Sequence, residues 1–90
     1  MNKRFSITVS GVVQGVFFRA STKAKADELG IKGFVSNQRD GSVYIEAEGE
    51  SERLKKFIQW CRNGPANASV ERCDVREMEF SGDQHFVIQR

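Results

Sequence analysis

Residues 5–19 read FSITVSGVVQGVFFR, and this stretch decides the fold because it contains two different hydrophobic periods. From Phe5 to Val9 apolar and polar side chains alternate, which is typical of a strand with one buried face. Beyond Gly15 the pattern becomes a helical stripe, made of Phe18, Thr22, Ala26 and Leu29. We therefore predict a strand that leads through a loop bracketed by two glycines directly into a short helix.

A β-hairpin is predicted after this helix. Gly30 can adopt the left-handed conformation in which many helices end. Residues 31–37 and 42–48 are strand-like, and the residues between them, 38–41, include an Asp-Gly pair that favours a tight turn. The two runs are therefore expected to be neighbouring antiparallel strands.

The second predicted helix has the clearest boundaries in the chain. Ser51 is the expected N-cap, and Gly64-Pro65 ends the helix. Its buried stripe is made of Leu54, Phe57, Ile58 and Cys61. Two further strands follow, one from about residue 70 to residue 77 and one near residues 85–89.

The order of these elements predicts the fold class. Strand, helix, strand, strand, helix and strand, followed by a short terminal strand, is the α+β arrangement called ferredoxin-like or split βαβ. We expect residues 1–90 to form a single domain with an antiparallel sheet and both helices on one face, because the apolar stripes of the helices need a partner. This architecture supports many unrelated functions, so it does not decide the function.

Composition and charge limit the classes of partner. The chain has 90 residues, with 14 Lys and Arg against 12 Asp and Glu, and a formal net charge of +2. The two signs are interleaved, so we expect neither a nucleic acid nor a membrane as partner. No stretch approaches the roughly 20 apolar residues of a membrane span, and no signal-peptide core follows Met1 to Arg4. A cytoplasmic protein is expected, and a monomer.

The few reactive side chains outside the first loop do not form a recognisable site. Cys61 and Cys73 are too few for a metal cage or a disulfide framework. Reduced, unreactive thiols are favoured, and a Cys61–Cys73 disulfide stays open because spacing alone does not show that the two approach each other. His85 is the only histidine and is expected to face outward from the last strand.

The loop between the first strand and the first helix is the first candidate site. Backbone N–H groups at a helix start lack intrahelical partners and lie at the positive end of the helix dipole, so a loop that turns them inward binds anions. Arg19 adds a planar set of donors that can hold a phosphate with two hydrogen bonds. A cation in this first turn is unfavourable by about 0.3–1 kcal/mol, which a bound anion would offset. The alternative is that Gly11 and Gly15 only shape a turn and that Arg19 is a solvated cation.

Asn37 is the second candidate, at the end of the second predicted strand. In the expected topology the ends of the first two strands could be near neighbours, which would bring the Asn37 carboxamide beside the loop. Physical reasoning alone favours an ordinary turn asparagine whose side chain bonds its own backbone.

Two long motifs stand out in the chain. The first is VSGVVQGVFFR at residues 9–19, and the second is GFVSN at residues 33–37, followed by Gly41-Ser42-Val43 and Gly49. They resemble the first and second signatures of the acylphosphatase family. Both motifs are long and have the spacing of the family, and the likeness covers essentially all 90 residues.

The resemblance implies an enzyme that hydrolyses the carboxyl–phosphate anhydride of small acyl phosphates to a carboxylate and inorganic phosphate. The phosphoryl oxygens would be held by the backbone N–H groups of Gln14, Gly15, Val16, Phe17 and Phe18. Arg19 would clamp the same oxygens, and Asn37 would orient the attacking water. Ser36 departs from the family pattern, in which a longer basic or amide side chain is more common, and this affects only flanking contacts.

The implied chemistry needs few groups. A carboxylate leaves without a general acid, and phosphoryl transfer depends mainly on positioning and charge stabilisation. The proton of the attacking water could pass to the phosphate of the substrate itself. We expect no Mg²⁺ and no other cofactor, because no carboxylate cluster with metal-ligand spacing is visible.

Two alternatives remain at this point. One is a non-catalytic anion- or RNA-binding module on the same fold, although RNA-binding sheets of this kind expose aromatic residues on their central strands and only Tyr44 is expected there. The other is a protein that keeps the anion loop but has lost efficient turnover, or a carbamoyl-phosphate-handling domain of a larger assembly, against which the short chain argues.

Overall fold

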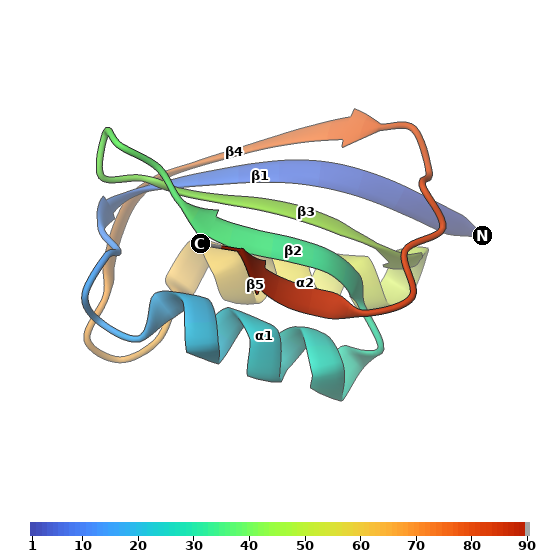
Figure 1. Cartoon of the computed structure of the whole chain (residues 1–90), viewed down its shortest axis with the longest axis horizontal. Helices are drawn as coiled ribbons and strands as arrows, with labels where there is room; N and C mark the ends of the chain where they lie inside the picture. The colour runs from blue at the N-terminus through green and yellow to red at the C-terminus, as the bar shows by residue number, and fades with distance from the viewer. Residues whose placement is uncertain (90) are drawn as a thin grey trace.

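The computed structural model describes residues 1–89 and has the predicted order of elements, with both helices on one side of the sheet (Figure 1). The elements are β1 (Asn2–Val12), α1 (Phe18–Leu29), β2 (Lys32–Asn37), β3 (Val43–Glu50), α2 (Ser51–Asn63), β4 (Ser69–Met78) and β5 (Phe86–Gln89). The ferredoxin-like α+β class is confirmed. Within the described residues, neither helix has the length and apolar character needed to cross a membrane.

The sheet has the strand order β4-β1-β3-β2-β5. All pairs among β1, β2, β3 and β4 are antiparallel, as predicted, but β5 lies parallel to β2. The expectation of an antiparallel sheet is therefore wrong for the terminal strand, and the sheet is mixed. The reason is geometric: a strand that returns along the sheet after β4 must run opposite to β4, and this is also the direction of β2 (Figure 1).

The core lies between the sheet and the two helices. Alternate residues of the central strands face the helices and are fully buried, namely Ile7, Val9, Val43, Ile45 and Ala47. The helices contribute the stripes expected from the sequence, with Phe18 and Phe57 the largest side chains. The ring of Phe57 packs edge to face against the ring of Phe86 in β5, with the ring centroids 6.0 Å apart. Burying each large apolar side chain stabilises the fold by about 1.5–3 kcal/mol, so this core fixes α1 against the sheet.

The N-terminus of α2 is capped by Glu50, so the prediction of Ser51 as N-cap is wrong. The carboxylate of Glu50 accepts hydrogen bonds from the backbone N–H groups of Glu52 at 2.7 Å and Arg53 at 3.2 Å. These bonds lower the pKa of Glu50. The hydroxyl of Ser51 instead donates to the Met1 carbonyl at 2.8 Å, which fastens the start of β1. The longer carboxylate side chain reaches two free N–H groups at once.

Both cysteines are free thiols, as expected. Cys61 belongs to the buried stripe of α2, and burial raises the pKa of its thiol. Cys73 is half-buried in β4, and burial raises its pKa as well. A thiol with a raised pKa carries little thiolate at neutral pH, so both side chains act here as small hydrophobic groups.

A buried ionic cluster lies on the sheet face opposite the helices. Arg4 and Glu48 are only 4% and 1% exposed, and Nη1 of Arg4 lies 2.6 Å from Oε1 of Glu48. Arg4 also pairs with Glu46 at 2.7 Å and with Asp83 at 3.0 Å. The Glu48 carboxylate accepts three further hydrogen bonds, at 2.7–2.9 Å, from the backbone N–H groups of residues 81–83. The cluster thus fastens the connection between β4 and β5 to the middle of the sheet.

The pKa of Glu48 is lowered by this environment. Burial alone would raise it, but the hydrogen bonds from the Ser81 backbone, the Arg4 guanidinium and the other two N–H groups outweigh that effect. A carboxyl group with a lowered folded-state pKa stabilises the protein above its ordinary pKa of 4.5, and this stability is lost as the pH falls through the folded-state value.

We predict that Glu48→Gln lowers the free energy of unfolding by about 3 kcal/mol at neutral pH, because it leaves the buried Arg4 without its closest charge partner. The difference in the free energy of unfolding between the variant and the wild type should become smaller below pH 4.5, because Glu48 of the wild type is then increasingly protonated and loses the same interaction. Urea unfolding at neutral pH and at about pH 3 measures both values. Glu77→Gln, on an exposed position of β4, is the control and should change little. An equal difference in the free energy of unfolding at both pH values would contradict the stabilising role of the ionised Glu48 carboxylate.

Candidate functional site

The loop between β1 and α1 leaves the N-terminus of α1 uncapped. The N-cap residue is Phe17, in the left-handed conformation with φ 60° and ψ 26°, and no side chain among residues 1–89 caps the helix with a hydrogen bond. No acidic residue lies in its first turn either. In contrast, α2 has the Glu50 carboxylate at the same place. The first N–H groups of α1 are therefore available to an anion, which the helix dipole also favours.

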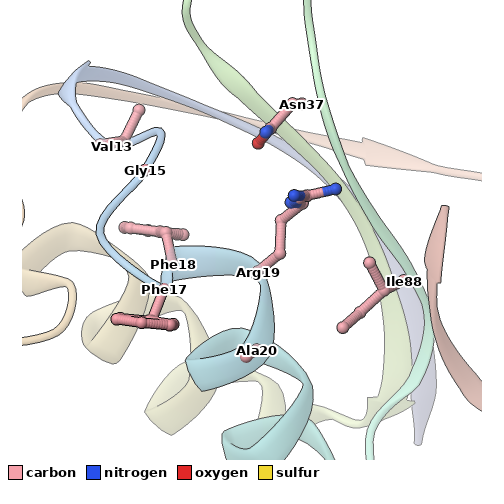
Figure 2. A pocket seen from close by; sticks show the side chains of 8 residues that line it. All are labelled: Val13, Gly15, Phe17, Phe18, Arg19, Ala20, Asn37 and Ile88. Atoms are coloured by element: carbon pink, nitrogen blue, oxygen red, sulfur yellow. The ribbon is translucent and has the colours of Figure 1, made fainter. Parts of the chain in front are cut away.

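A cleft of about 300 Å³ opens beside this helix start. Its lining comes from the loop, from the first turn of α1, from the end of β2 and from β5, and comprises Val13, Gly15, Phe17, Phe18, Arg19, Ala20, Asn37 and Ile88. Figure 2 shows the side chains of Arg19 and Asn37 reaching toward one another across this cleft. The cleft thus combines a cation, a carboxamide and an uncapped helix N-terminus.

The strand register explains why Asn37 lies at this cleft. Val43 of β3 pairs with Asn37 on one side and with Val9 of β1 on the other. Asn37, the last residue of β2, therefore lies at the level of Val9 with one strand between them, and β1 runs on to Val12 before the loop begins. The neighbourhood of Asn37 and the loop that the topology predicted is confirmed, and a functional role for Asn37 stays a prediction.

The five residues predicted to hold phosphate through their backbone do not all line the cleft. Gly15, Phe17 and Phe18 line it. Val16 is half-buried and packs against the core, and Gln14 directs its side chain to the hairpin, where Nε2 donates to the carbonyls of residues 38 and 42. Their backbone N–H groups belong to the same loop, so the assignment of these two positions stays a prediction.

The guanidinium of Arg19 is not engaged by a carboxylate of the described chain. The ion pairs within residues 1–89 involve the cations of Arg4, Lys23, Lys25, Lys55 and Arg72, and none involves Arg19. Arg19 is half-buried at the cleft, beside the positive end of the α1 dipole. A cation held there without a counter-charge from residues 1–89 is suited to bind an anionic ligand.

Sequence reasoning missed the contribution of β5 to the cleft. Ile88 pairs in parallel register with Val35 of β2, which brings its side chain beside Arg19 (Figure 2). The period-2 pattern does place Ile88 on one face with Phe86, but it contains no information on which strand β5 joins. Among residues 1–89, no three His, Cys, Asp or Glu side chains come together as metal ligands.

Comparison with known proteins identifies the family. The sequence model of the family described as Acylphosphatase matches residues 5–88. The chain belongs to the acylphosphatase family. It is 48% identical over 81 residues to an acylphosphatase of Methylococcus capsulatus, covering 90% of this chain and 88% of the relative.

Solved structures agree with this assignment of family and fold. The acylphosphatase of Bacillus subtilis superposes with a TM-score of 0.95 at 35% identity, with all of both chains covered. The HypF protein of T. kodakarensis contains a similar unit, with a TM-score of 0.85 at 29% identity. That match covers all of this chain but only 12% of HypF. The acylphosphatase fold therefore also occurs within a much longer chain.

The acylphosphatase loop uses two left-handed residues, Gly15 with φ 74° and Phe17 with φ 60°. A β-carbon added at Gly15 would meet no heavy atom within 4 Å. Glycine is therefore needed at this position for its backbone conformation and not for space. Phe17 adopts the same region although it is not glycine, and the residue is 79% exposed at the cleft.

We predict that Gly15→Ala lowers the free energy of unfolding by about 1–2 kcal/mol, because an L-residue is disfavoured in the left-handed region. Activity on an acyl phosphate should fall as well, since the loop can relieve the strain only by turning its N–H groups away. Urea unfolding and initial rates measure the two effects. Gly82→Ala is the matched control, with φ 86° and open space, and should lose stability but keep activity. Wild-type stability and activity in Gly15→Ala would contradict the role of the loop.

Proposed function

We propose that this chain hydrolyses the carboxyl–phosphate anhydride of small acyl phosphates in the cleft between the β1–α1 loop and the end of β2. Membership of the acylphosphatase family makes the chain a hydrolase of acyl phosphates. The observation that carries the assignment of the site is the convergence of Arg19 and Asn37 on an uncapped helix N-terminus. The products are a carboxylate and inorganic phosphate.

In this proposal the phosphoryl group binds to the loop and to Arg19. In the proposal its oxygens accept hydrogen bonds from the backbone N–H groups of residues 14–18, and the left-handed conformation of Gly15 and Phe17 supports a loop that turns these groups toward the cleft. Arg19 contributes two further donors in a planar arrangement and a full positive charge. This environment stabilises the negative charge that spreads over the oxygens in the transition state.

Asn37 orients the attacking water in the same proposal. Its carboxamide lies across the cleft from the loop, at the end of β2, whereas the groups proposed to bind phosphate belong to the loop and to α1 (Figure 2). A carboxamide can accept a hydrogen bond from water with its oxygen and donate one with its nitrogen, so it can fix the direction of attack. Fixing a nucleophile in line with the leaving group removes much of the entropic barrier.

The reaction then needs no acid or base from the protein. The water oxygen forms a bond to phosphorus, the bond from phosphorus to the carboxyl oxygen breaks, and the carboxylate leaves with the electron pair. One proton of the water passes to an oxygen of the transferred phosphoryl group. A carboxylate is stable without protonation, so the leaving group needs no general acid.

Several finer properties stay predictions. They are a single domain over residues 1–90, a monomer, a cytoplasmic location, a metal-independent reaction and the absence of a nucleic acid partner.

The alternative of an RNA-binding module has one feature in its favour. Phe34 joins Tyr44 on the sheet face away from the helices, with ring centroids 6.0 Å apart, so this face has two aromatic residues where the sequence indicated one. However, Tyr44 donates to Glu46 at 2.8 Å, and the carboxylate of Glu46 lies beside the pair. A carboxylate there repels the phosphates of RNA, so the hydrolase is the better supported function.

We predict that Arg19→Lys and Asn37→Ala both lower kcat by about 100- to 1000-fold on an aromatic acyl phosphate, because each removes a group that acts on the transition state. The two should differ in the inhibition constant of inorganic phosphate. Arg19→Lys should raise this constant at least several-fold, whereas Asn37→Ala should leave it nearly unchanged, since Asn37 contacts the water and not the phosphate. Steady-state kinetics with phosphate as competitive inhibitor measure both quantities. Full activity in either folded variant would overturn the proposed roles.

We predict that EDTA does not change the activity, because Arg19 and the loop already supply the charge and the donors for the phosphoryl group. The assay compares initial rates before and after dialysis against the chelator, and again after Mg²⁺ is added back. Loss of activity on chelation and its recovery with Mg²⁺ would rule out the metal-independent reaction.

Titration with a short single-stranded RNA in the same buffer should show no tight binding.

A further inference from the structure

The side chain of Gln14 makes a pair of hydrogen bonds that the mechanism above does not use. Its Nε2 donates to the Gln38 carbonyl at 2.8 Å and to the Ser42 carbonyl at 2.9 Å. A carboxamide nitrogen carries two N–H groups, so both of its donors are engaged. We infer that Gln14 is a positioning residue that fixes the phosphate-binding loop relative to Asn37, an inference that rests on the proposed function.

The two acceptors belong to a turn that is already closed by its own hydrogen bonds. The N–H of Gln38 donates to the Ser42 carbonyl at 2.9 Å, and the N–H of Gly41 donates to the Gln38 carbonyl at 3.2 Å. The carboxylate of Asp40 also accepts from the N–H of Ser42 at 2.9 Å and from its hydroxyl at 2.6 Å. Gln14 therefore attaches to a fixed structure and uses the second acceptor position of each carbonyl.

The hydrogen bonds join the two halves of the site beyond the point where the β1–β3 ladder ends. The ladder between β1 and β3 ends at the pair Val9 and Val43. Within residues 1–89, Gln14 makes the side-chain hydrogen bonds that connect the loop to the hairpin. Gln14 is adjacent to Gly15 in the loop, and Gln38 is adjacent to Asn37, so the link lies one residue from the site on each side.

The chemistry of this link is specific for an amide donor. Two carbonyl oxygens face the same nitrogen, so a carboxylate at position 14 would bring a negative oxygen against both of them. A thioether such as Met has nearly the same length but cannot donate a hydrogen bond. The side chain can be changed while the backbone N–H of residue 14 stays in place, which separates this role from phosphate binding by the loop.

Loss of the Gln14 hydrogen bonds should affect the attack of water on phosphorus more than the binding of phosphate. Arg19 and the N–H groups of the loop all belong to the β1–α1 segment, so they keep their mutual positions and still bind phosphate. Asn37 belongs to the other side of the link and would no longer be held at a fixed distance from the phosphorus. A misplacement of about 1 Å between reacting groups lowers a rate by about 100-fold.

The test is a double-mutant cycle with Gln14→Met and Asn37→Ala, with Gln59→Met on the exposed face of α2 as the matched control. We expect Gln14→Met to lower kcat about 10- to 100-fold and to change the inhibition constant of inorganic phosphate less than 3-fold. In the Asn37→Ala background the same change should lower kcat less than 3-fold, because the group that Gln14 positions is gone. Gln59→Met should keep wild-type kinetics.

A second variant keeps the inference testable if Gln14→Met does not fold. Gln14→Glu should lower kcat more strongly at neutral pH, and its kcat relative to the wild type should rise as the pH falls toward 4, where the carboxyl group gains an O–H donor. Circular dichroism and inhibition by phosphate show in each case that the loop is intact. Gln14→Asn, which keeps the amide on a shorter side chain, should have a kcat at neutral pH between those of Gln14→Glu and the wild type.

The outcomes separate this inference from the proposed function. If the wild type does not hydrolyse an acyl phosphate, the proposed function fails. If Asn37→Ala keeps the wild-type kcat, the proposed role of Asn37 fails, and the positioning role of Gln14 fails with it. If Asn37→Ala is impaired while Gln14→Met has the wild-type kcat, only the positioning role fails. If Gln14→Met lowers kcat by the same factor in the wild type and in Asn37→Ala, the positioning role is also overturned. The two substitutions would then act independently, as expected for a purely structural effect of Gln14.

Discussion

The N-terminus of α1 presents backbone N–H groups that no side chain among the described residues caps, and the site depends on this arrangement. A capped helix would have its donors occupied, as α2 has by Glu50. The left-handed residues Gly15 and Phe17 turn the chain sharply enough for the loop to curl over the helix start. Arg19 adds its charge where the helix dipole is already positive, so the binding of phosphate that we propose would relieve two unfavourable features together.

The two faces of the sheet have different roles in holding this arrangement. On one face the apolar core packs both helices against the strands, which fixes the start of α1 at the end of β1. On the other face the buried pair of Arg4 and Glu48 fastens the connection that leads to β5. The short strand β5 follows that connection, pairs with β2 and brings Ile88 to the cleft.

Much of the fold was predictable because it depends on local periodicity. The bounds of α1, the end of α2 at Gly64 and the hairpin between β2 and β3 agree with the pattern of apolar residues and turn residues. The N-cap of α2 and the parallel pairing of β5 were not predictable. The first depends on how far the Glu50 side chain reaches, and the second on the path of the chain after β4.

The sequence by itself determined the order of elements, the family and the residue types of the site, because periodic patterns and motifs are properties of neighbouring residues. Only the tertiary structure decided that Arg19 and Asn37 face one cleft, that Ile88 lines it, and that the Gln14 amide reaches across to the hairpin. The physical reason is that strand register and side-chain hydrogen bonds join residues that are far apart in the chain. A local pattern predicts that a strand forms, but it does not contain the partner with which the strand pairs.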